Sequence, residues 1–515
     1  MFKSLFRFAS AALFAGVLGC STHSTIWLFN VVPNTVVPSL VCDSSTTTGY
    51  GGGTGTSADP YAICSPVQWL FLATDSASWN KYFKLYANLD FTGVTFADFN
   101  MIGNTTTAFT GQLDGNNFSL MNLNITSPSA DISFFKKTDG NVTIKNLTLK
   151  NITLNSGARV AGLILNHANG GTLNLENIAL DTLNLNMTVG NANENGGLIG
   201  RTDGPANFNT IRINSIIFAN PPSSSNFNGG LLGYSVTPIV MSNITGNTIS
   251  FLQGFAFSQI GGLAGYIRNT ASFSNINLTG LNLKGDLVGG LTNGTYSTTV
   301  VSQVHLAGSI AGGTRAAGLI VFLNSAGVTN TTVAESSFDG NIAASDAAGL
   351  ICISYHSNLA ISKSYFKGNI TDIWNGIGAG LVRNAQDAAT TLSISDSYAV
   401  SNLTGIHATN YRIAGLVGGT TNTTVIARSY YSGTLNGTMP KACIGQTSGA
   451  ISYLTADVYY NSTLCLATAD VSGGAIPGSV GLATAALQTA TPFTNWLPSV
   501  WTFSNSQNPK LSWEP

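Results

Sequence analysis

The chain has 515 residues, of which 44% are hydrophobic and only 8% are charged, and its formal net charge is −1. An intrinsically disordered chain needs low hydrophobicity and high net charge, so this composition excludes disorder. Nucleic-acid binding needs clustered Lys and Arg that neutralise phosphates, and the sequence has no such cluster. We therefore expect no nucleic-acid partner.

The first 19 residues predict a signal peptide. Basic residues precede a short apolar run, Ala9–Leu18, which is too short to cross a bilayer. The segment Val17–Cys20 is similar to the lipobox of bacterial lipoproteins, which implies lipidation of Cys20. We predict an exported protein at the outer membrane or cell surface, held to the membrane through this lipid anchor. Cleavage by an ordinary signal peptidase is the alternative.

Two segments separate this leader from the central part of the chain. Residues 20–58 are rich in Thr and Gly, a composition that predicts a flexible tether. Residues 59–115 predict an N-terminal cap with a helix that begins at Ser65 and Pro66. Serine is a favoured helix N-cap, and proline is favoured in the first turn.

Nine Gly-Leu dipeptides form a series through the middle of the chain, at steps of 28 to 35 residues, while Gly280-Leu281 and Gly481-Leu482 fall outside this series. A period of this length is typical of stacked repeats, in which each unit buries its apolar face against its neighbours. Short apolar alternations between Gly and Asn favour strands. We therefore predict an all-β fold, a parallel β-helix of about ten coils over residues 116–440, with inward-pointing leucines stacked from coil to coil. The predicted core leucines are Leu163, Leu198, Leu231, Leu263, Leu291, Leu319, Leu350, Leu381 and Leu416.

Residues 441–515 differ from the repeats and predict a C-terminal cap. They contain Trp496, Trp501 and Trp513. A cluster of large aromatic side chains suits plugging the end of a coil, where unpaired strand edges invite aggregation. Ligand binding by these tryptophans is the alternative.

The spacing of four cysteines predicts two disulfides. Cys42 and Cys64 are 22 residues apart, as are Cys443 and Cys465, and each pair flanks one end of the repeats. A secreted chain tolerates disulfides, so we predict both bonds. Unpaired cysteines are the alternative, because spacing alone does not establish connectivity.

The repeats resemble those of the GLUG family of bacterial surface and secreted proteins. The motif Gly-Gly-Leu-Val-Gly of that family corresponds to Gly196–Gly200 and Gly229–Gly233, and its Ser-Tyr step to Ser364-Tyr365 and Ser397-Tyr398. The resemblance covers about residues 60–513 and implies a β-solenoid on a surface protein, often adhesin-like. Some relatives carry a protease domain beside the repeats, notably the immunoglobulin A proteases.

The sequence offers few residues for catalysis. The His-Glu-x-x-His motif of zinc proteases and the Gly-x-Ser-x-Gly motif of hydrolases are absent. A carbohydrate-active β-helix needs paired carboxylates, and the candidates are Asp339 with Asp346 and Asp387 with Asp396. We expect these four to be solvated corner residues. We predict no catalytic residue, no cofactor and no metal site.

These features together predict a non-enzymatic surface protein. Its solenoid would display a long face to a host, a neighbouring cell or a glycan, because one strand face repeats along the whole array. A structural or spacer protein of the cell envelope is the first alternative. A carbohydrate-active β-helix enzyme is the second.

Overall fold

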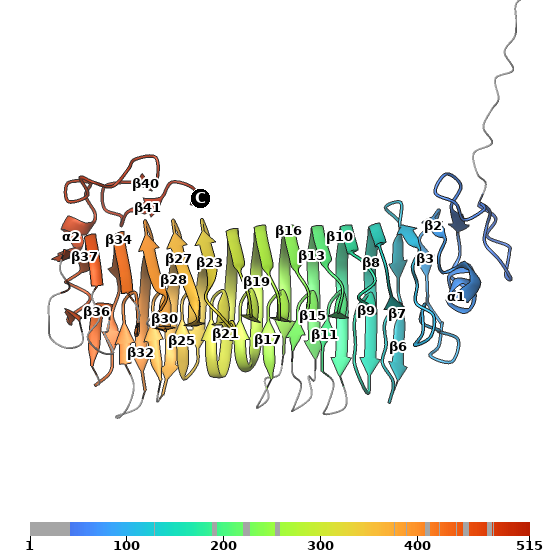
Figure 1. The fold of residues 1–515 in the computed structure, drawn as a ribbon, viewed down its shortest axis with the longest axis horizontal. Helices are drawn as coiled ribbons and strands as arrows, with labels where there is room; N and C mark the ends of the chain where they lie inside the picture. Colours follow the sequence, from blue (N-terminus) through green and yellow to red (C-terminus); the bar gives the residue numbers. More distant parts are fainter. Residues whose placement is uncertain are drawn as a thin grey trace, which may run out of the picture. The chain divides into compact units, whose positions relative to one another are not determined.

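The computed structural model describes residues 42–514, apart from residues 128, 188–192, 220–226, 253–257, 375, 388, 407–411, 422, 439, 446–452, 471–475 and 477. The predicted signal peptide and Cys20 fall within residues 1–41, which lie outside the described residues. Over the described residues, the strands form a parallel β-solenoid of about 11 turns (Figure 1). The predicted fold class is therefore confirmed.

The strands of successive coils pair in parallel on several faces. One ladder contains β7 (Phe135–Thr138) and the short strands that follow the first eight Gly-Leu pairs of the series: β9 (Ile164–His167), β12 (Ile199–Thr202), β15 (Leu232–Ser235), β18 (Ala264–Ile267), β20 (Thr292–Thr295), β22 (Ile320–Leu323), β26 (Ile351–Tyr355) and β30 (Val382–Gln386). The ladder next to it contains β11 (Asn195–Gly196), β14 (Asn228–Gly229), β17 (Gln259–Gly261), β25 (Asp346–Ala348), β29 (Ile377–Ala379), β33 (Arg412–Ala414), β36 (Lys441–Gly445) and β38 (Thr468–Asp470).

Long strands that bend around a corner form the remaining faces. In the earlier coils they are β8 (Val142–Ser156), β10 (Leu173–Met187), β13 (Ala206–Ala219), β16 (Ile239–Phe251), β19 (Ala271–Gly289) and β21 (Thr299–Ala317). In the later coils most of them divide into shorter strands: β23 (Thr329–Ala334), β24 (Ser337–Ala343), β27 (Ser357–Ser362), β28 (Tyr365–Ile373), β31 (Thr391–Ser395), β32 (Tyr398–Gly405), β34 (Thr423–Ser432), β35 (Leu435–Asn436), β37 (Tyr453–Asn461) and β39 (Ser479–Leu482).

The leucines of the Gly-Leu pairs form a column through the interior. The backbone N–H of Leu163 donates to the carbonyl of Leu198 at 3.1 Å, and the same bond recurs from coil to coil as far as Leu416. All nine leucine side chains are fully buried. The preceding glycines allow the coils to approach closely, since a Cβ on Gly197 would lie 2.0 Å from the carbonyl oxygen of Gly230. Each fully buried leucine contributes about 1.5–3 kcal/mol of transfer free energy.

One corner of the solenoid turns at a residue with left-handed backbone geometry in coil after coil. The φ angles at this corner lie between 44° and 57°. Asn tolerates this region better than most residues, which explains its frequency in the earlier coils. We name this column the corner ladder. Its members are Asn146, Asn177, Thr210, Asn243, Asn275, Gln303, Glu335, Lys363, Asp396, Arg428 and Asp457.

The parallel ladder begins before the predicted start of the repeats at residue 116. Phe83 pairs with Leu113, and Leu113 pairs with Ile144 in β8, so residues assigned by sequence to the N-terminal cap already form coils. These coils lack the Gly-Leu signature, and α1 (Pro66–Thr74) packs on them. Trp69 of α1 makes edge-to-face contacts with Phe91, Phe134 and Phe135. The elements here are β1 (Tyr61–Ile63), α1 (Pro66–Thr74), a short 3-10 helix (Ser76–Ser78), β2 (Tyr82–Leu85), β3 (Leu89–Asp90), β4 (Gln112–Asp114), β5 (Ser119–Met121) and β6 (Asn124–Ser127).

Both predicted disulfides are present, Cys42–Cys64 and Cys443–Cys465. The first bond ties residues 42–58, which lie within the predicted tether, to the chain just before α1. Backbone hydrogen bonds join the same two segments: the Gly51 N–H donates to the carbonyl of Ala62 at 2.8 Å, and the Ala62 N–H donates to the carbonyl of Gly52 at 2.8 Å. The helix begins as predicted, with the Ser65 hydroxyl accepting from the Gln68 N–H and proline in the first turn. Two disulfides fit an oxidising, extracellular compartment.

Candidate functional site

Side chains on the outer face next to the corner ladder are aligned across the whole array. We name this alignment the outer column. Strand register pairs each member with the next, so their spacing equals the spacing of the coils, about 4.8 Å. The first seven members are small, polar or charged, and the last four are tyrosines. In order they are Thr148, Ala179, Arg212, Thr245, Asn277, His305, Ser337, Tyr365, Tyr398, Tyr430 and Tyr459.

The tyrosines of the outer column stack ring on ring. The centroids of Tyr365 and Tyr398 are 5.1 Å apart, and those of Tyr398 and Tyr430 are 4.8 Å apart with nearly parallel planes. The serine before each tyrosine explains the Ser-Tyr step of the sequence. The Ser364 N–H donates to the Ser397 hydroxyl at 3.2 Å, while the Ser397 hydroxyl donates to the carbonyl of Ser395 at 2.7 Å. The serine hydroxyl therefore provides a hydrogen-bond partner for backbone groups at the corner, and the tyrosine that follows it points outward.

The C-terminal residues cover these tyrosines. We name residues 483–514 the strap; it contains α2 (Thr484–Leu487), β40 (Trp501–Thr502) and β41 (Lys510–Leu511). The Tyr459 hydroxyl donates to the carbonyl of Pro492 at 2.8 Å, and the Tyr430 hydroxyl donates to that of Pro509 at 2.6 Å. The strap therefore runs back along the side of the last coils, as Figure 1 also shows.

This path differs from the predicted plug at the end of the coil. Trp496 and Trp501 are buried and pack on the stacked tyrosines from the side. The Trp501 indole N–H donates to Asp396 of the corner ladder at 3.3 Å. The physical reason is that four outward tyrosine rings form an apolar strip, which the strap removes from water.

The last described residues of the strap lie beside Tyr365, the first tyrosine of the outer column. Trp513 stacks on both Tyr365, with ring centroids 5.4 Å apart, and His305, with centroids 4.6 Å apart. Its indole N–H donates to the carbonyl of Lys363 at 3.1 Å. The following residue, Glu514, is nearly buried; it accepts from the Tyr398 hydroxyl at 2.7 Å and pairs with Lys367. These contacts hold the last turn of the strap in one position.

Two cavities open beside Trp513 and His305, and we name them the strap-end hollows. The first has a volume of about 290 Å³ and reaches Ser337, Asp339 and Tyr365. The second has a volume of about 280 Å³ and lies along the corner ladder beside Gln303 and Glu335. Burial raises the pKa of Asp339, although its carboxylate accepts from the Tyr365 hydroxyl at 3.0 Å. Burial lowers the pKa of His305, which favours the neutral imidazole.

The four candidate carboxylates do not form catalytic pairs in the structure, because each has a different partner. Asp346 pairs with Arg383 at 2.8 Å and with Arg315 at 3.3 Å. Asp396 pairs with Arg428 at 2.6 Å, and Asp387 contacts His356 at 2.5 Å. These charged corners are satisfied by the neighbouring coil, so the expectation of simple solvated corners missed their ion pairs.

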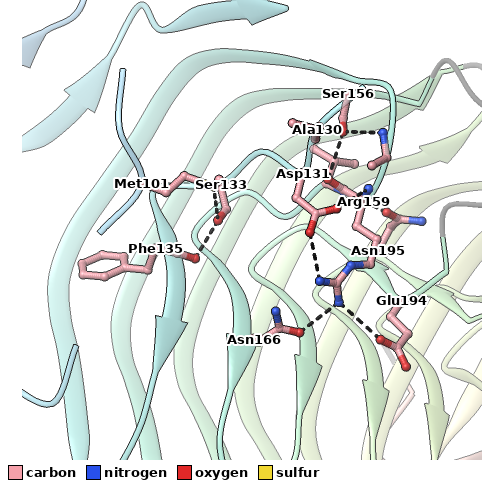
Figure 2. Close-up of polar contacts among 12 residues, drawn as sticks. Met101, Ala130, Asp131, Ser133, Phe135, Ser156, Arg159, Asn166, Glu194 and Asn195 are labelled. Atoms are coloured by element: carbon pink, nitrogen blue, oxygen red, sulfur yellow. Dashed lines mark hydrogen bonds and ion pairs between the residues drawn. The ribbon is translucent and has the colours of Figure 1, made fainter. Parts of the chain in front are cut away.

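A second polar cluster links three coils near the start of the array (Figure 2). Arg159 lies at its centre and contacts Asp131 at 3.0 Å, Asn166 at 2.9 Å and Glu194 at 3.5 Å. Arg201 reaches Glu194 from the other side at 2.8 Å. Each arginine of this cluster is paired with acidic side chains, so we interpret the cluster as a contact that holds neighbouring coils together and not as a reactive site.

The described histidines and carboxylates give no sign of a metal centre. His167 is buried and has a partner at each ring nitrogen, Thr138 at 2.9 Å and the carbonyl of Gly171 at 3.1 Å. In the part of the chain that the structure describes, no three His, Cys, Asp or Glu side chains gather as metal ligands. His23 and His407 lie outside the described residues. Among the described residues, no helix has the length and apolarity needed to cross a membrane.

Comparison with known proteins finds only partial similarity to this chain. No family model matches the chain, so the resemblance to GLUG repeats stays a prediction. Halomucin of Haloquadratum walsbyi is 28% identical over 203 residues, which cover 36% of this chain and 2% of Halomucin. A crystal structure from Bacteroides ovatus, assigned provisionally as an immunoglobulin A1 protease, aligns over 90% of this chain and 96% of its own at 15% identity, with a TM-score of 0.19. A TM-score this low carries no structural argument.

Proposed function

We propose that this chain is a non-enzymatic attachment protein of the cell surface, anchored by a lipid at Cys20. The observation that carries the proposal is the outer column, which presents a row of side chains at the regular spacing of the coils. Such a row suits a partner that is itself extended and repetitive, such as a glycan or a surface polymer. The two disulfides support an exported location.

The partnered carboxylates favour attachment over catalysis. A general acid or base has to be free to exchange a proton with its substrate. Asp346 and Asp396 instead hold arginines from neighbouring coils. This arrangement uses their charge for cohesion between coils, as a scaffold requires.

A spacer function is the second candidate. The observation in its favour is that the corner ladder and the arginine cluster both strengthen the array along its axis. The function of a spacer should change with the length of the array, whereas the function of an attachment protein should change with the side chains of one face. An experiment can vary these two properties separately.

The test compares three versions of the chain on cells that otherwise lack it. The first is the full chain, and the second is Arg212→Glu, which reverses an outer-column charge in the region that the strap does not reach. The third lacks residues 142–205, which removes two coils, retains Arg212 and keeps the register, because Val142, Leu173 and Ala206 are aligned. Attachment should need the full chain, fall with Arg212→Glu and be retained to a larger extent when the two coils are deleted.

Two controls complete the test. Protease treatment of intact cells should remove the full chain if it is displayed outside, and Cys20→Ala should release it into the medium. If cells without the chain attach as well as cells that carry it, the attachment function is wrong. If only the shortened chain changes the phenotype, the spacer function is correct instead.

A further inference from the structure

The strap-end hollows exist because small side chains interrupt two rows of larger ones. In the outer column, Ser337 lies between His305 and Tyr365. In the next outward row, Ala307 pairs with Asp339. The strap then adds Trp513 above this gap instead of filling it. The first hollow is therefore built by the end of the strap together with residues of four successive coils.

Aromatic and polar groups are combined in these hollows. Trp513, His305 and Tyr365 provide flat surfaces, while Asp339 and Asn277 provide hydrogen-bonding groups at the edge of the first hollow. A pyranose ring has the matching chemistry, with C–H faces that pack on aromatic rings and hydroxyl groups around its rim that both donate and accept. A cavity of about 290 Å³ is at the small end of ligand sites, which suits a single sugar ring.

The charges around the hollows favour an uncharged ligand. Asp339 and Glu335 place carboxyl groups in the two walls. The nearby lysines are engaged by carboxylates, Lys367 by Glu514 and Lys363 by Glu335. An acidic sugar would face these carboxylates without an unpaired cation to balance it.

We propose that the strap-end hollows bind an uncharged oligosaccharide, with one sugar ring in each hollow and the stacked pair Trp513 and His305 between them. Both hollows share this pair in their walls, so two linked rings can occupy them together. The inference rests on the proposed attachment function and names the class of its ligand. It also assigns a role to the strap, which completes the site with its last aromatic residue.

The experiment measures binding of four neutral disaccharides to the full chain by saturation-transfer NMR and titration of tryptophan fluorescence. The probes are lactose, maltose, cellobiose and N,N′-diacetylchitobiose, with 3′-sialyllactose as the acidic comparison. We expect at least one neutral disaccharide to bind and 3′-sialyllactose to bind at least tenfold more weakly. Binding of none of the four, or tighter binding of 3′-sialyllactose, would overturn the inference.

Variants then locate the site. Ser337→Tyr extends the stacked tyrosines by one ring and fills the first hollow, so it should weaken binding at least tenfold. Thr245→Tyr places the same side chain in the same column, two coils beyond His305 and away from the hollow, and should bind like the parent chain. Should Ser337→Tyr fail to fold, Ala307→Leu fills the gap from the next row. Unchanged affinity in a folded filling variant would show that sugar binds elsewhere and would overturn the proposal.

Attachment assays with the same variants keep the two claims apart. If deletion of the chain abolishes attachment but Ser337→Tyr attaches normally, the attachment function stands and the assignment of its ligand site falls. If deletion has no effect on attachment, the attachment function falls whether or not sugar binds.

Discussion

The two halves of the corner ladder satisfy the same backbone geometry with different chemistry. In the earlier coils every member of the ladder except Thr210 is an amide: Asn177 donates to Asn146 at 2.8 Å, and Asn275 donates to Asn243 at 2.7 Å. In the later coils it alternates in charge, from Glu335 through Lys363, Asp396 and Arg428 to Asp457.

The outer column also differs between the earlier and the later coils. Its earlier members, such as Thr245 and Asn277, are exposed, while Tyr398 and Tyr430 are buried under the strap. The comparison shows that a repeated backbone does not require repeated side chains. Each half only needs side chains that pair with those one coil away. The half with charged corners also carries the strap, which bonds to Asp396 and Lys363.

The largest expected effect is the loss of a tyrosine under the strap. Tyr430→Ala removes a ring that is 1% exposed and stacks on Tyr398. We expect the free energy of unfolding to fall by about 3–5 kcal/mol, as for other buried aromatic residues. Thr245→Ala is the matched control in the exposed half of the same column and should change stability by less than about 0.5 kcal/mol. Urea unfolding measures both; equal losses would mean that the strap does not bury this face.

The next effect concerns the amide half of the ladder. Asn243→Ala removes an amide that donates to Asn209 at 2.8 Å and accepts from Asn275, at a residue with a φ of 56°. Alanine in this conformation costs about 1–2 kcal/mol, and the lost hydrogen bonds add to it, so we expect a loss of about 2 kcal/mol. Asn243→Gly keeps the backbone freedom and should lose about half as much. Identical losses for the two variants in thermal unfolding would exclude the backbone contribution.

A smaller effect is expected in the charged half. Lys363→Glu places an acidic residue between Glu335 and Asp396 and breaks the ion pair with Glu335 at 3.3 Å. Both groups are more than one-third exposed, so we expect a loss of only about 0.5–1 kcal/mol. The loss should shrink in 1 M salt, where charges are screened over about 3 Å. Lys363→Gln is the control, and a loss independent of salt would contradict an electrostatic origin.

The smallest effect is a pH dependence at the strap end. Burial raises the pKa of Asp339 above its ordinary value, so the folded state holds the proton more tightly than the unfolded state. The carboxyl group therefore favours folding below its ordinary pKa of 3.8, and this contribution is lost as the pH rises through the folded pKa. Asp339→Asn should be more stable than the parent at pH 7 and lose this advantage at pH 3. Melting temperatures at both pH values test this, and a parent that is the more stable at pH 7 would contradict it.

The sequence by itself determined the fold class and the inward column of leucines. These follow from local and periodic information: alternation decides which side chains point inward, and the Gly-Leu period decides that coils stack. The spacing of the cysteines predicted both disulfides, and the structure established their connectivity. The start of the helix at Ser65 was also evident, because an N-cap depends on neighbouring residues alone.

Only the tertiary structure decided which outward residues meet. The coils differ in length, so the alignment of His305, Ser337 and Tyr365 depends on where each coil makes its corner. The route of the strap depends on an apolar strip of tyrosines that exists only after the coils stack. For this reason Trp513 was expected at the end of a coil, and the structure places it instead beside His305, where the strap-end hollows form.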